Sequence, residues 1–568
     1  MSEQSLYETA VSGGGFEPPR PKVRASAAVV LWRREPSGGL RVFWMRRDPA
    51  MRFMGGWHAF PGGAVSRDDA AAEESGVPAW IGGAPSGLSD REATGAMPET
   101  LTAGLDPLPP DRVPGLLSAT FRELFEETGL LPAAGGAATA AREPLEQARR
   151  DLLSKRAGFG DMVESLVPEG NPGLDASRLV FAGRWLTPPF APLRFDNRFF
   201  LLEHRPGEPE PAVPDEADAA GWVDPREALE LWRRGEVITA PPILHVLRVL
   251  AEDGVEKGLP RLRRPDEVNL GPFRRIEFRP GVVMLPLATP TLPPATHTNA
   301  YLLAPPGGGA SVLVDPGTPF AEEGERLEAA MEAAAAAGLP LEAIWLTHHH
   351  PDHVGAVGRL VERFRVPVAA HPATAERLEP RGIRVDRTLR DGERIALGPA
   401  GEGPGPGRLS LQVLHTPGHA PGHLCFLEEG LGSLLAGDMV SAVSTIVIDP
   451  PDGDMDDYLA SLERLAGVGA RTLFPGHGPA VVQAEEALRE LVEHRLRRED
   501  RILEAWRSGM RDPAEMLPSV YDDAPREAWP LAQRQIEAHL RRLARAGAIE
   551  REDPKAGAGP GTTSGGAA

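Results

Sequence analysis

Apolar and polar positions alternate along the chain in three successive patterns. Between about residues 25 and 250, short apolar runs such as ASAAVVLWRR (25–34), LRVFWMRR (40–47) and FDNRFFLLEH (195–204) are separated by turns and by two helical stretches. Such runs, bounded by Gly and Pro, are typical of buried strands. From about residue 281 to 485 strands alternate with helices, which predicts an α/β sandwich rather than an all-α or all-β domain. The pattern from 486 to 553 is helical, with a short final strand at 546–553.

The breaks between these patterns predict several domains, because 568 residues are too many for one core. Both ends are poor in apolar residues and predict disorder. The predicted divisions are a disordered N-terminus (1–21), a first domain (22–250) with an insertion at about 70–115, a linker (251–280), a second domain (281–485), a helical domain (486–553) and a disordered tail (554–568).

Composition narrows the class of protein. The formal net charge of −20 argues against a nucleic-acid-binding surface over the whole protein, although a local basic face remains open. The single cysteine, Cys425, excludes an internal disulfide framework and a zinc site made only of cysteines. No apolar run is long enough to span a membrane, and the N-terminus lacks the pattern of a signal peptide. We therefore expect a cytoplasmic protein.

A cluster of histidines follows the predicted strand 341–347. In THHHPDH (347–353), two imidazoles two residues apart can reach one metal ion, while the aspartate and the last histidine can reach a second. Three further turns, TPGH, GD and PGHG, each bring a ligand-type side chain to a strand end. Four such turns predict a metal site rather than a run of surface histidines.

The order THHHPDH, TPGH, GD, PGHG resembles the metallo-β-lactamase superfamily, which has a four-layer αββα fold. The resemblance implies two metal ions that activate a water molecule lying between them and polarise the substrate carbonyl or phosphoryl oxygen. It implies Zn²⁺ at both positions, with Mn²⁺ or Fe²⁺ as alternatives. Carried over, the ligands are His348, His350 and His419 for the first ion, Asp352, His353 and His477 for the second, and Asp438 for both, with Asp352 also catalytic.

Other residues of this domain have less specific roles. His371 and His423 are structural or, alternatively, face the substrate or form hydrogen bonds that orient the metal ligands. No cysteine takes the place of a second-metal ligand, which argues against a β-lactamase of the kind that needs one. Aspartate in that position is usual for hydrolases of thioesters, phosphodiesters and RNA.

The helical segment 486–553 is similar to a small winged-helix module. Ile536, Leu540 and Leu543 are spaced so that one face of its last helix is apolar. With THTNAYLL (296–303), this appendage resembles the β-lactamase-like 2 subgroup, which includes a single-strand endoribonuclease. Arginines on the same helix offer a basic side to single-stranded RNA, or form an ordinary solvated face: Arg534, Arg541, Arg542 and Arg545.

A second candidate site lies in FRELFEETGLL (121–131), on a helix predicted over 118–128 with Ser118 as N-cap and Gly129 just past the end. Glu123, Glu126 and Glu127 share one face of that helix, where their like charges favour a bound cation such as Mg²⁺. The alternative is an exposed acidic helix with an Arg122–Glu126 pair.

The string RELFEETGL resembles the second half of the Nudix box, and Gly63 followed six residues later by Asp69 resembles its first half, with Asp in place of Glu. An insertion separates the halves. This split box resembles the Nudix subgroup that contains peroxisomal coenzyme A diphosphatases, an α/β/α sandwich. It implies Mg²⁺ or Mn²⁺ on Glu123, Glu126 and Glu127, with Glu126 and Glu127 also catalytic. Arg122, Gly63 and Asp69 would shape the loop or face the substrate.

Together these motifs predict a two-headed metal-dependent hydrolase. One head would cleave a nucleotide or coenzyme-A-type substrate linked through a nucleoside diphosphate. The other would hydrolyse a thioester, ester or phosphodiester. Two alternatives remain open: turnover of RNA or nucleotides, with endoribonuclease activity in the second head, and a non-catalytic head that binds a nucleotide as a regulator.

Overall fold

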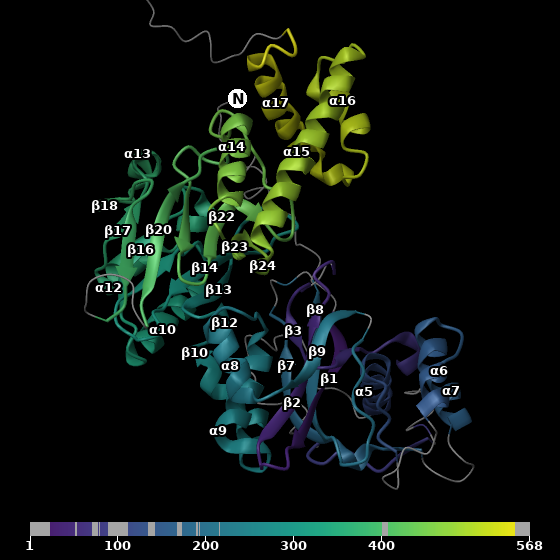
Figure 1. Cartoon of the computed structure of the whole chain (residues 1–568). Helices are drawn as coiled ribbons and strands as arrows, with labels where there is room; N and C mark the ends of the chain where they lie inside the picture. The colour runs from purple at the N-terminus through teal and green to yellow at the C-terminus, as the bar shows by residue number, and fades with distance from the viewer. Residues whose placement is uncertain are drawn as a thin grey trace, which may run out of the picture. The chain divides into compact units, whose positions relative to one another are not determined.

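The computed structural model describes residues 23–51, 54–70, 78, 80–88, 112–133, 142–166, 173–188, 191, 193–214, 216–399 and 407–550. The chain forms two compact units, one mainly from residues 19–285 and one mainly from residues 286–568. Each unit is described by itself (Figure 1).

The first unit is built on a seven-stranded mixed sheet. Its order is β3–β2–β1–β8–β7, with β4 beside β1 and β9 beside β2. The first two strands form a hairpin with Trp32 opposite Val42, and the long β8 runs parallel to β1. The strands are β1 (Val23–Arg34), β2 (Leu40–Arg47), β3 (His58–Ala59), β4 (Gly62–Ala64), β7 (Val180–Leu186), β8 (Arg194–Glu203) and β9 (Ala217–Val223), and a small separate sheet pairs β5 (Ile81–Gly82) with β6 (Leu174–Asp175).

Helices cover both faces of this sheet, because side chains of a strand point alternately to its two sides. Val29 and Leu31 pack in one apolar cluster with Phe121 and Phe125 of α5. Val30 packs in the other, with residues of α8 and α9. In Figure 1, α5 and the pair α8 and α9 lie on opposite sides of this sheet. The helices are α5 (Val113–Thr128), α6 (Arg142–Leu153), α7 (Phe159–Leu166), α8 (Pro225–Arg233) and α9 (Pro241–Arg263), the last kinked at Gly254.

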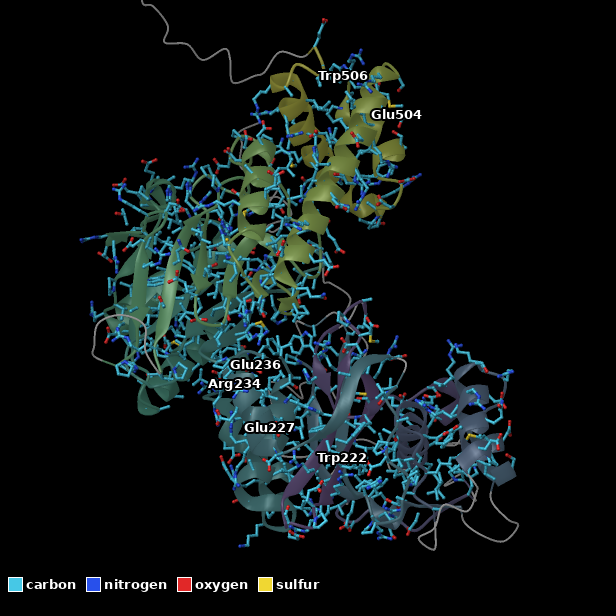
Figure 2. The ribbon with its side chains drawn as sticks, viewed as in Figure 1. Trp222, Glu227, Arg234, Glu236, Glu504 and Trp506 are labelled. Atoms are coloured by element: carbon cyan, nitrogen blue, oxygen red, sulfur yellow. The ribbon has the colours of Figure 1, made fainter. Side chains whose placement is uncertain are left out.

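Polar side chains lie at both ends of α8 on the surface of this unit. Asp224 caps α8 by accepting a hydrogen bond from the amide of Arg226. Arg234 and Glu236, labelled in Figure 2, form an exposed ion pair in the turn after α8. Such surface pairs contribute little stability, so the core of this unit rests on the two apolar clusters.

Residues 276–482 contain two further sheets, each with its strands in chain order. The pairs β15–β16 and β16–β17 are parallel, so the chain crosses between them through α10 and through α11–α12. The first sheet comprises β12 (Ile276–Arg279), β13 (Val282–Ala288), β14 (His297–Leu303), β15 (Ser311–Val314), β16 (Leu341–Trp345), β17 (Val368–Ala370) and β18 (Arg387–Thr388). The second comprises β19 (Arg394–Leu397), β20 (Leu409–His415), β21 (Leu424–Glu428), β22 (Ser433–Ser441), β23 (Thr472–His477) and β24 (Val481–Val482).

In the described part of the chain, five helices accompany these sheets and three more follow. Tyr458 and Leu462 of α14 pack on Leu434 of β22 and Leu473 of β23 in one cluster, so α14 covers the second sheet. The helices are α10 (Ala321–Ala336), α11 (Pro351–Val354), α12 (Val357–Phe364), α13 (Pro372–Leu378), α14 (Met455–Ala466), α15 (Ala484–Arg507), α16 (Pro513–Val520) and α17 (Trp529–Arg545).

The last three helices share an apolar cluster of their own. The predicted apolar face of the final helix is confirmed, since Ile536, Leu540 and Leu543 are all buried there. In the described residues 546–550 the predicted short terminal strand does not form, and 551–553 lie outside the described residues. The predicted disordered ends, 1–21 and 554–568, also lie outside them.

The predicted fold class is confirmed: two α/β parts are followed by a small helical module. The predicted start of α5 is wrong, because the helix begins at Val113 and Ser118 lies inside it. The division into domains stays a prediction. Within 251–280 the chain forms the second half of α9, β10 (Asn269–Leu270), β11 (Phe273–Arg274) and β12. No helix among the described residues is long and apolar enough to cross a membrane.

Candidate metal centres

The histidine turn lies at the end of β16 and leads directly into the short helix α11. His350 takes extended backbone angles before Pro351, which has the fixed φ suited to the first helical position. The chain therefore turns sharply. His348, Asp352 and His353 are buried, whereas His349 points elsewhere and pairs with Asp452, with His349 Nε2 3.2 Å from Asp452 Oδ2.

The predicted first-ion ligands lie together. His350 Nδ1 is 2.9 Å from His348 Nε2 and 2.9 Å from His419 Nε2, so three ring nitrogens point to one position. The predicted second set also gathers: Asp352 Oδ2 lies 3.9 Å from His353 Nε2 and 3.7 Å from His477 Nε2.

Asp438 lies between the two sets. Its Oδ1 is 3.4 Å from both His353 Nε2 and His477 Nε2, and its Oδ2 is 3.6 Å from His419 Nε2. We expected this aspartate just after its strand, but it lies within β22, where the pairing with β23 shifts register between Gly437 and Ser441. The irregularity turns the carboxylate toward the histidines.

Hydrogen bonds from behind fix the orientation of the imidazoles. His419 Nδ1 meets the carbonyl oxygen of Val447 at 2.8 Å, and His477 Nδ1 meets that of His297 at 3.0 Å. His353 Nδ1 meets Asp315 Oδ2 at 2.8 Å. Each contact leaves Nε2 facing the centre, as ligating histidines require.

The electrostatics divides the cluster into two parts. Burial lowers the pKa of His348 well below its usual value, and the neighbouring imidazoles of His353 and His350 lower it further. Burial also opposes charge on His353, but the carboxylates of Asp438, Asp352 and Asp315 outweigh it and raise the pKa of His353 well above its usual value. One side of the centre is thus a neutral donor set, and the other carries the carboxylates.

Two observations fit a metal centre. His353 Nε2 and Asp438 Oδ1 are buried and have no hydrogen-bond partner within the described part of the chain, although they face each other. Unpaired buried polar atoms are costly, and cations between them would satisfy both. A Cβ on Gly476 would lie 2.2 Å from Asp438 Oδ1, so glycine is needed for the carboxylate to take this place.

His423 and His371 occupy different surroundings. His423 lies directly behind the centre, where its Nε2 accepts from the amide of Asp438 at 3.1 Å. His371 caps α13 by accepting from the amide of Ala373 and stacks on His415 at 4.1 Å. Burial and the nearby His415 lower the pKa of His371 to about 4.

Sequence reasoning missed Asp315, Thr347 and Thr298. Asp315 accepts from the amide and hydroxyl of Thr347 in addition to contacting His353. Thr298 donates its hydroxyl to Asp352 Oδ2 at 3.1 Å. The signal for Asp315 was present, since it directly follows the apolar strand SVLV.

The glutamates of α5 form the second candidate centre. Glu127 Oε2 accepts from the amide of Gly62 at 2.7 Å, and Arg122 lies 2.9 Å from Glu123 and 2.8 Å from Glu126. Burial raises the pKa of Glu123 to about 7 in spite of the opposing charge of Arg122. Among the described residues, three ligand atoms come close enough to share one ion only in the histidine centre. The carboxylate oxygens of the three glutamates lie farther from one another than that.

Asp69 and Gly63 connect the first half of the motif to this helix. Asp69 is buried and pairs with Arg122 at 2.8 Å, and it accepts the hydroxyls of Ser66 and Ser118. Its carboxylate therefore fixes Arg122 rather than pointing toward the glutamates. A Cβ on Gly63 would lie 2.4 Å from the Glu123 carboxylate, so the glycine makes room for that side chain.

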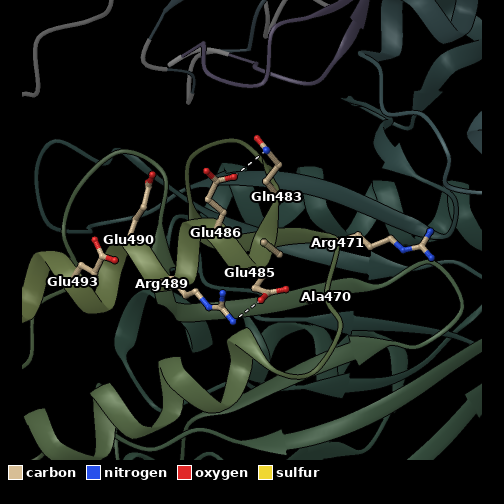
Figure 3. A pocket seen from close by; sticks show the side chains of 9 residues that line it. Ala470, Arg471, Gln483, Glu485, Glu486, Arg489, Glu490 and Glu493 are labelled. Atoms are coloured by element: carbon tan, nitrogen blue, oxygen red, sulfur yellow. Dashed lines mark hydrogen bonds and ion pairs between the residues drawn. The ribbon is translucent and has the colours of Figure 1, made fainter. Parts of the chain in front are cut away.

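A separate pocket of about 780 Å³ lies at the start of α15 (Figure 3). It holds none of the candidate ligands. Gln483 donates to Glu486 and Arg489 pairs with Glu485 along its wall.

Three family models match successive parts of the chain. They are the NUDT19 Nudix domain over residues 22–250, the metallo-beta-lactamase superfamily over residues 293–477 and the beta-lactamase associated winged helix domain over residues 513–556.

Curated relatives match the second part. A beta-lactamase-like protein 2 homolog of Caenorhabditis elegans is 27% identical over 258 residues, which is 44% of this chain and 80% of the relative. A hydroxyacylglutathione hydrolase of Acidiphilium cryptum is 34% identical, over 32% of this chain and 64% of the relative. An atrochrysone carboxyl ACP thioesterase of Aspergillus fumigatus is 27% identical, over 38% of this chain and 61% of the relative.

These matches confirm the families inferred from the motifs and the hydrolase class. Both domain families imply divalent metal ions, and the His and Asp clusters can bind them. The chain therefore carries a Nudix domain first, a metallo-β-lactamase domain second and a β-lactamase-associated winged-helix domain last.

Proposed function

We propose that the protein is a two-headed hydrolase, in which the histidine centre hydrolyses a thioester and the Nudix domain cleaves a coenzyme-A-type or other nucleoside-diphosphate-linked substrate. The first part rests on the position of Asp438 between the two ligand sets. Its Oδ1 and His353 Nε2 face one another, and neither has a hydrogen-bond partner in the described part of the chain. The Nudix part rests on the box residues around α5.

The histidine centre would hold two ions. His348, His350 and His419 would bind the first, and Asp352, His353 and His477 the second, with Asp438 shared. Imidazole and carboxylate ligands suit Zn²⁺, with Mn²⁺ or Fe²⁺ as alternatives. Bound ions of this kind lower the pKa of water and polarise a carbonyl oxygen. The protein orients the ligands through Asp315, Val447 and His297 and keeps most of them away from bulk water.

Two observations favour a thioester over RNA. Relatives of this domain include a named thioesterase and a hydroxyacylglutathione hydrolase, the latter a hydrolase of a thioester by its name. The arginines considered for RNA are turned to protein carboxylates: Arg534 to Asp449, Arg541 to Glu537, Arg542 to Glu499 and Arg545 to Asp454. Phosphates would have to compete with these pairs.

RNA cleavage remains the second candidate for the histidine centre. It is favoured by the match to beta-lactamase-like protein 2 homologs and by the associated winged-helix domain. The same metal ligands would serve a phosphodiester, so substrate assays must decide between the two.

In the Nudix head, Glu123, Glu126 and Glu127 would hold Mg²⁺ or Mn²⁺. When bound, such an ion neutralises phosphate charge during cleavage of a phosphoanhydride. Arg122, held by Asp69, would keep Glu123 and Glu126 in position. Carboxylate oxygens are the ligands that Mg²⁺ prefers in proteins.

A substrate panel tests both heads in the full-length chain. Coenzyme A, acyl-coenzyme A, ADP-ribose and single-stranded RNA would be offered with Mg²⁺, Mn²⁺ or Zn²⁺. We expect His350→Ala to abolish thioester cleavage, while His349→Ala, whose ring pairs with Asp452, keeps it. We expect Glu126→Gln to abolish diphosphate cleavage, while Glu164→Gln on the exposed side of α7 keeps it.

Each contrary result has a clear meaning. Full thioesterase activity and metal content in His350→Ala would remove the histidine centre from the reaction. Unchanged diphosphate cleavage in Glu126→Gln would remove the glutamates. RNA cleavage without thioester cleavage would favour the second candidate, and nucleotide binding without turnover would make the Nudix head a regulator.

A further inference from the structure

The segment after β22 lies between the histidine centre and the C-terminal helices. Within it, the carbonyl oxygen of Val447 meets His419 Nδ1 at 2.8 Å. This contact decides which ring nitrogen of His419 faces the other imidazoles. The position of one peptide therefore controls the orientation of a first-ion ligand.

The C-terminal helices hold the chain on both sides of the Val447 carbonyl. Arg495 of α15 and Gln535 of α17 both donate to the carbonyl oxygen of Ile446, Gln535 at 2.8 Å. Arg495 also donates to the side-chain oxygen of Gln535 at 3.1 Å, so the two side chains act as one clamp. Beyond Val447, Arg534 donates to Asp449 Oδ1 at 2.5 Å and to the carbonyl of Pro450 at 2.8 Å.

A second line of contacts runs from the same arginine toward Asp438. The Arg495 guanidinium lies 5.2 Å from the centre of the Tyr458 ring. The Tyr458 hydroxyl donates to the carbonyl of Met439, the residue after Asp438, at 2.9 Å. Gly418, beside His419, approaches Tyr458 so closely that a Cβ there would lie 2.3 Å from its Cα.

Burial makes this arrangement specific. Arg495 is 2% exposed and Gln535 5% exposed, and both bond to main-chain oxygen or to each other. Burying a guanidinium is costly unless its donors are satisfied. Two Arg495 nitrogens donate to Gln535 and to the carbonyl oxygen of Ile446, whereas its Nε has no partner in the described part of the chain, so the arginine depends on these two contacts. Ile446 and Ile448 also pack in one cluster with Leu488 of α15 and Ala538 of α17.

We propose that Arg495 and Gln535 are positioning residues, through which the C-terminal module fixes the Ile446–Asp449 segment and thereby the imidazole of His419. This proposal rests on the proposed metal-binding role of the histidine centre. The winged-helix module is then part of the metal centre's support and not only a candidate substrate-binding appendage.

The test uses the full-length chain loaded with Co²⁺, whose visible absorption reports the ligands of the ion. Gln535→Leu removes both hydrogen bonds of the glutamine at similar size, and Arg495→Met removes the guanidinium. Arg541→Met is the control, since Arg541 lies on the same helix and pairs within it with Glu537. Each protein is titrated with a chelator and its melting temperature is recorded.

We expect Gln535→Leu to release one of two Co²⁺ ions at a chelator concentration roughly tenfold lower than wild type, with a changed absorption spectrum. Arg541→Met should match wild type, and Arg495→Lys should lose less than Arg495→Met. The positioning role would be overturned if Gln535→Leu and Arg495→Met both released Co²⁺ as wild type does and kept its absorption spectrum. It would also be overturned if a variant lost both ions equally and only to the extent that its melting temperature fell. If wild type binds no Co²⁺, or His350→Ala keeps the wild-type content, the proposed function itself fails, which is a different result.

Discussion

Asp315 lies beside the second half of the histidine centre, where it contacts the predicted ligand His353. Its Oδ2 meets His353 Nδ1 at 2.8 Å, and its two oxygens also accept from Thr347. Asp315→Asn keeps the size and removes the charge. We expect the second ion to bind about 10–100-fold more weakly, because outer partners of ligating histidines have effects of this size. Metal content after dialysis at fixed free Zn²⁺ measures this.

The control for Asp315 is Asp452→Asn. Asp452 also pairs with a histidine of the same turn, but that histidine is His349, which does not face the centre. Metal content should be unchanged in this variant. Equal metal content in both variants would show that the Asp315 carboxylate is not needed for the ion.

Asp69 makes a prediction about stability rather than chemistry. Asp69 is buried, so Asp69→Ala removes one of the three carboxylates around Arg122 and also the acceptor of the Ser66 and Ser118 hydroxyls. We expect a loss of about 3 kcal/mol in the free energy of unfolding of the Nudix domain. Denaturant unfolding followed by tryptophan fluorescence measures it. Asp151→Ala, which breaks the more exposed pair with Arg156, should cost less than about 1 kcal/mol. Similar losses in the two variants would contradict this account.

At the scale of elements, most of the predicted ligands lie at or just after the ends of strands. This placement could be predicted because their motifs directly follow apolar runs in the sequence. His350 after β16, His419 after β20 and His477 at the end of β23 follow that rule. Asp438 does not, because a register shift with β23 near Gly437 lets β22 continue past it. A register shift depends on the neighbouring strand, which a pattern within one segment cannot reveal. The start of α5 was missed for a similar reason, since Ser118 bonds to the distant Asp69 instead of capping a helix.

Gly476, near the end of β23, gives the prediction for this scale. A Cβ at this position would lie 2.2 Å from Asp438 Oδ1 and 3.1 Å from His353 Cε1. Gly476→Ala should therefore displace the shared carboxylate and reduce bound metal, while the secondary structure seen by circular dichroism is retained. Gly358→Ala is the control, because a Cβ there meets no atom within 4 Å and alanine favours the interior of α12. Full metal content in Gly476→Ala would mean that the carboxylate has another place to go.

At the scale of the whole molecule, the sequence predicted two hydrolase domains because each family is marked by several residues at fixed spacing. The supports of the sites could not be predicted in this way. Val447, Arg495 and Gln535 make their contacts between distant segments, and a main-chain carbonyl such as that of Val447 leaves no signal in the sequence. The role of Asp69 is similar, since only its contact with Arg122 shows that it holds the motif together.

The two centres differ in chemistry, and this predicts different responses to metal removal. The first offers buried imidazoles with two aspartates, among them His348 and His353, both 0% exposed. The second offers carboxylates, with the Glu126 side chain 22% exposed. Carboxylate sites hold Mg²⁺ with few protein ligands and several waters, whereas nitrogen-rich sites bind Zn²⁺ tightly.

Brief gel filtration of the full-length chain in EDTA should therefore abolish diphosphate cleavage while thioester cleavage persists. Added Mg²⁺ should restore the first activity within the mixing time, and only prolonged chelation should remove the second. Loss of both activities with one time course would contradict two independent metal centres of these kinds.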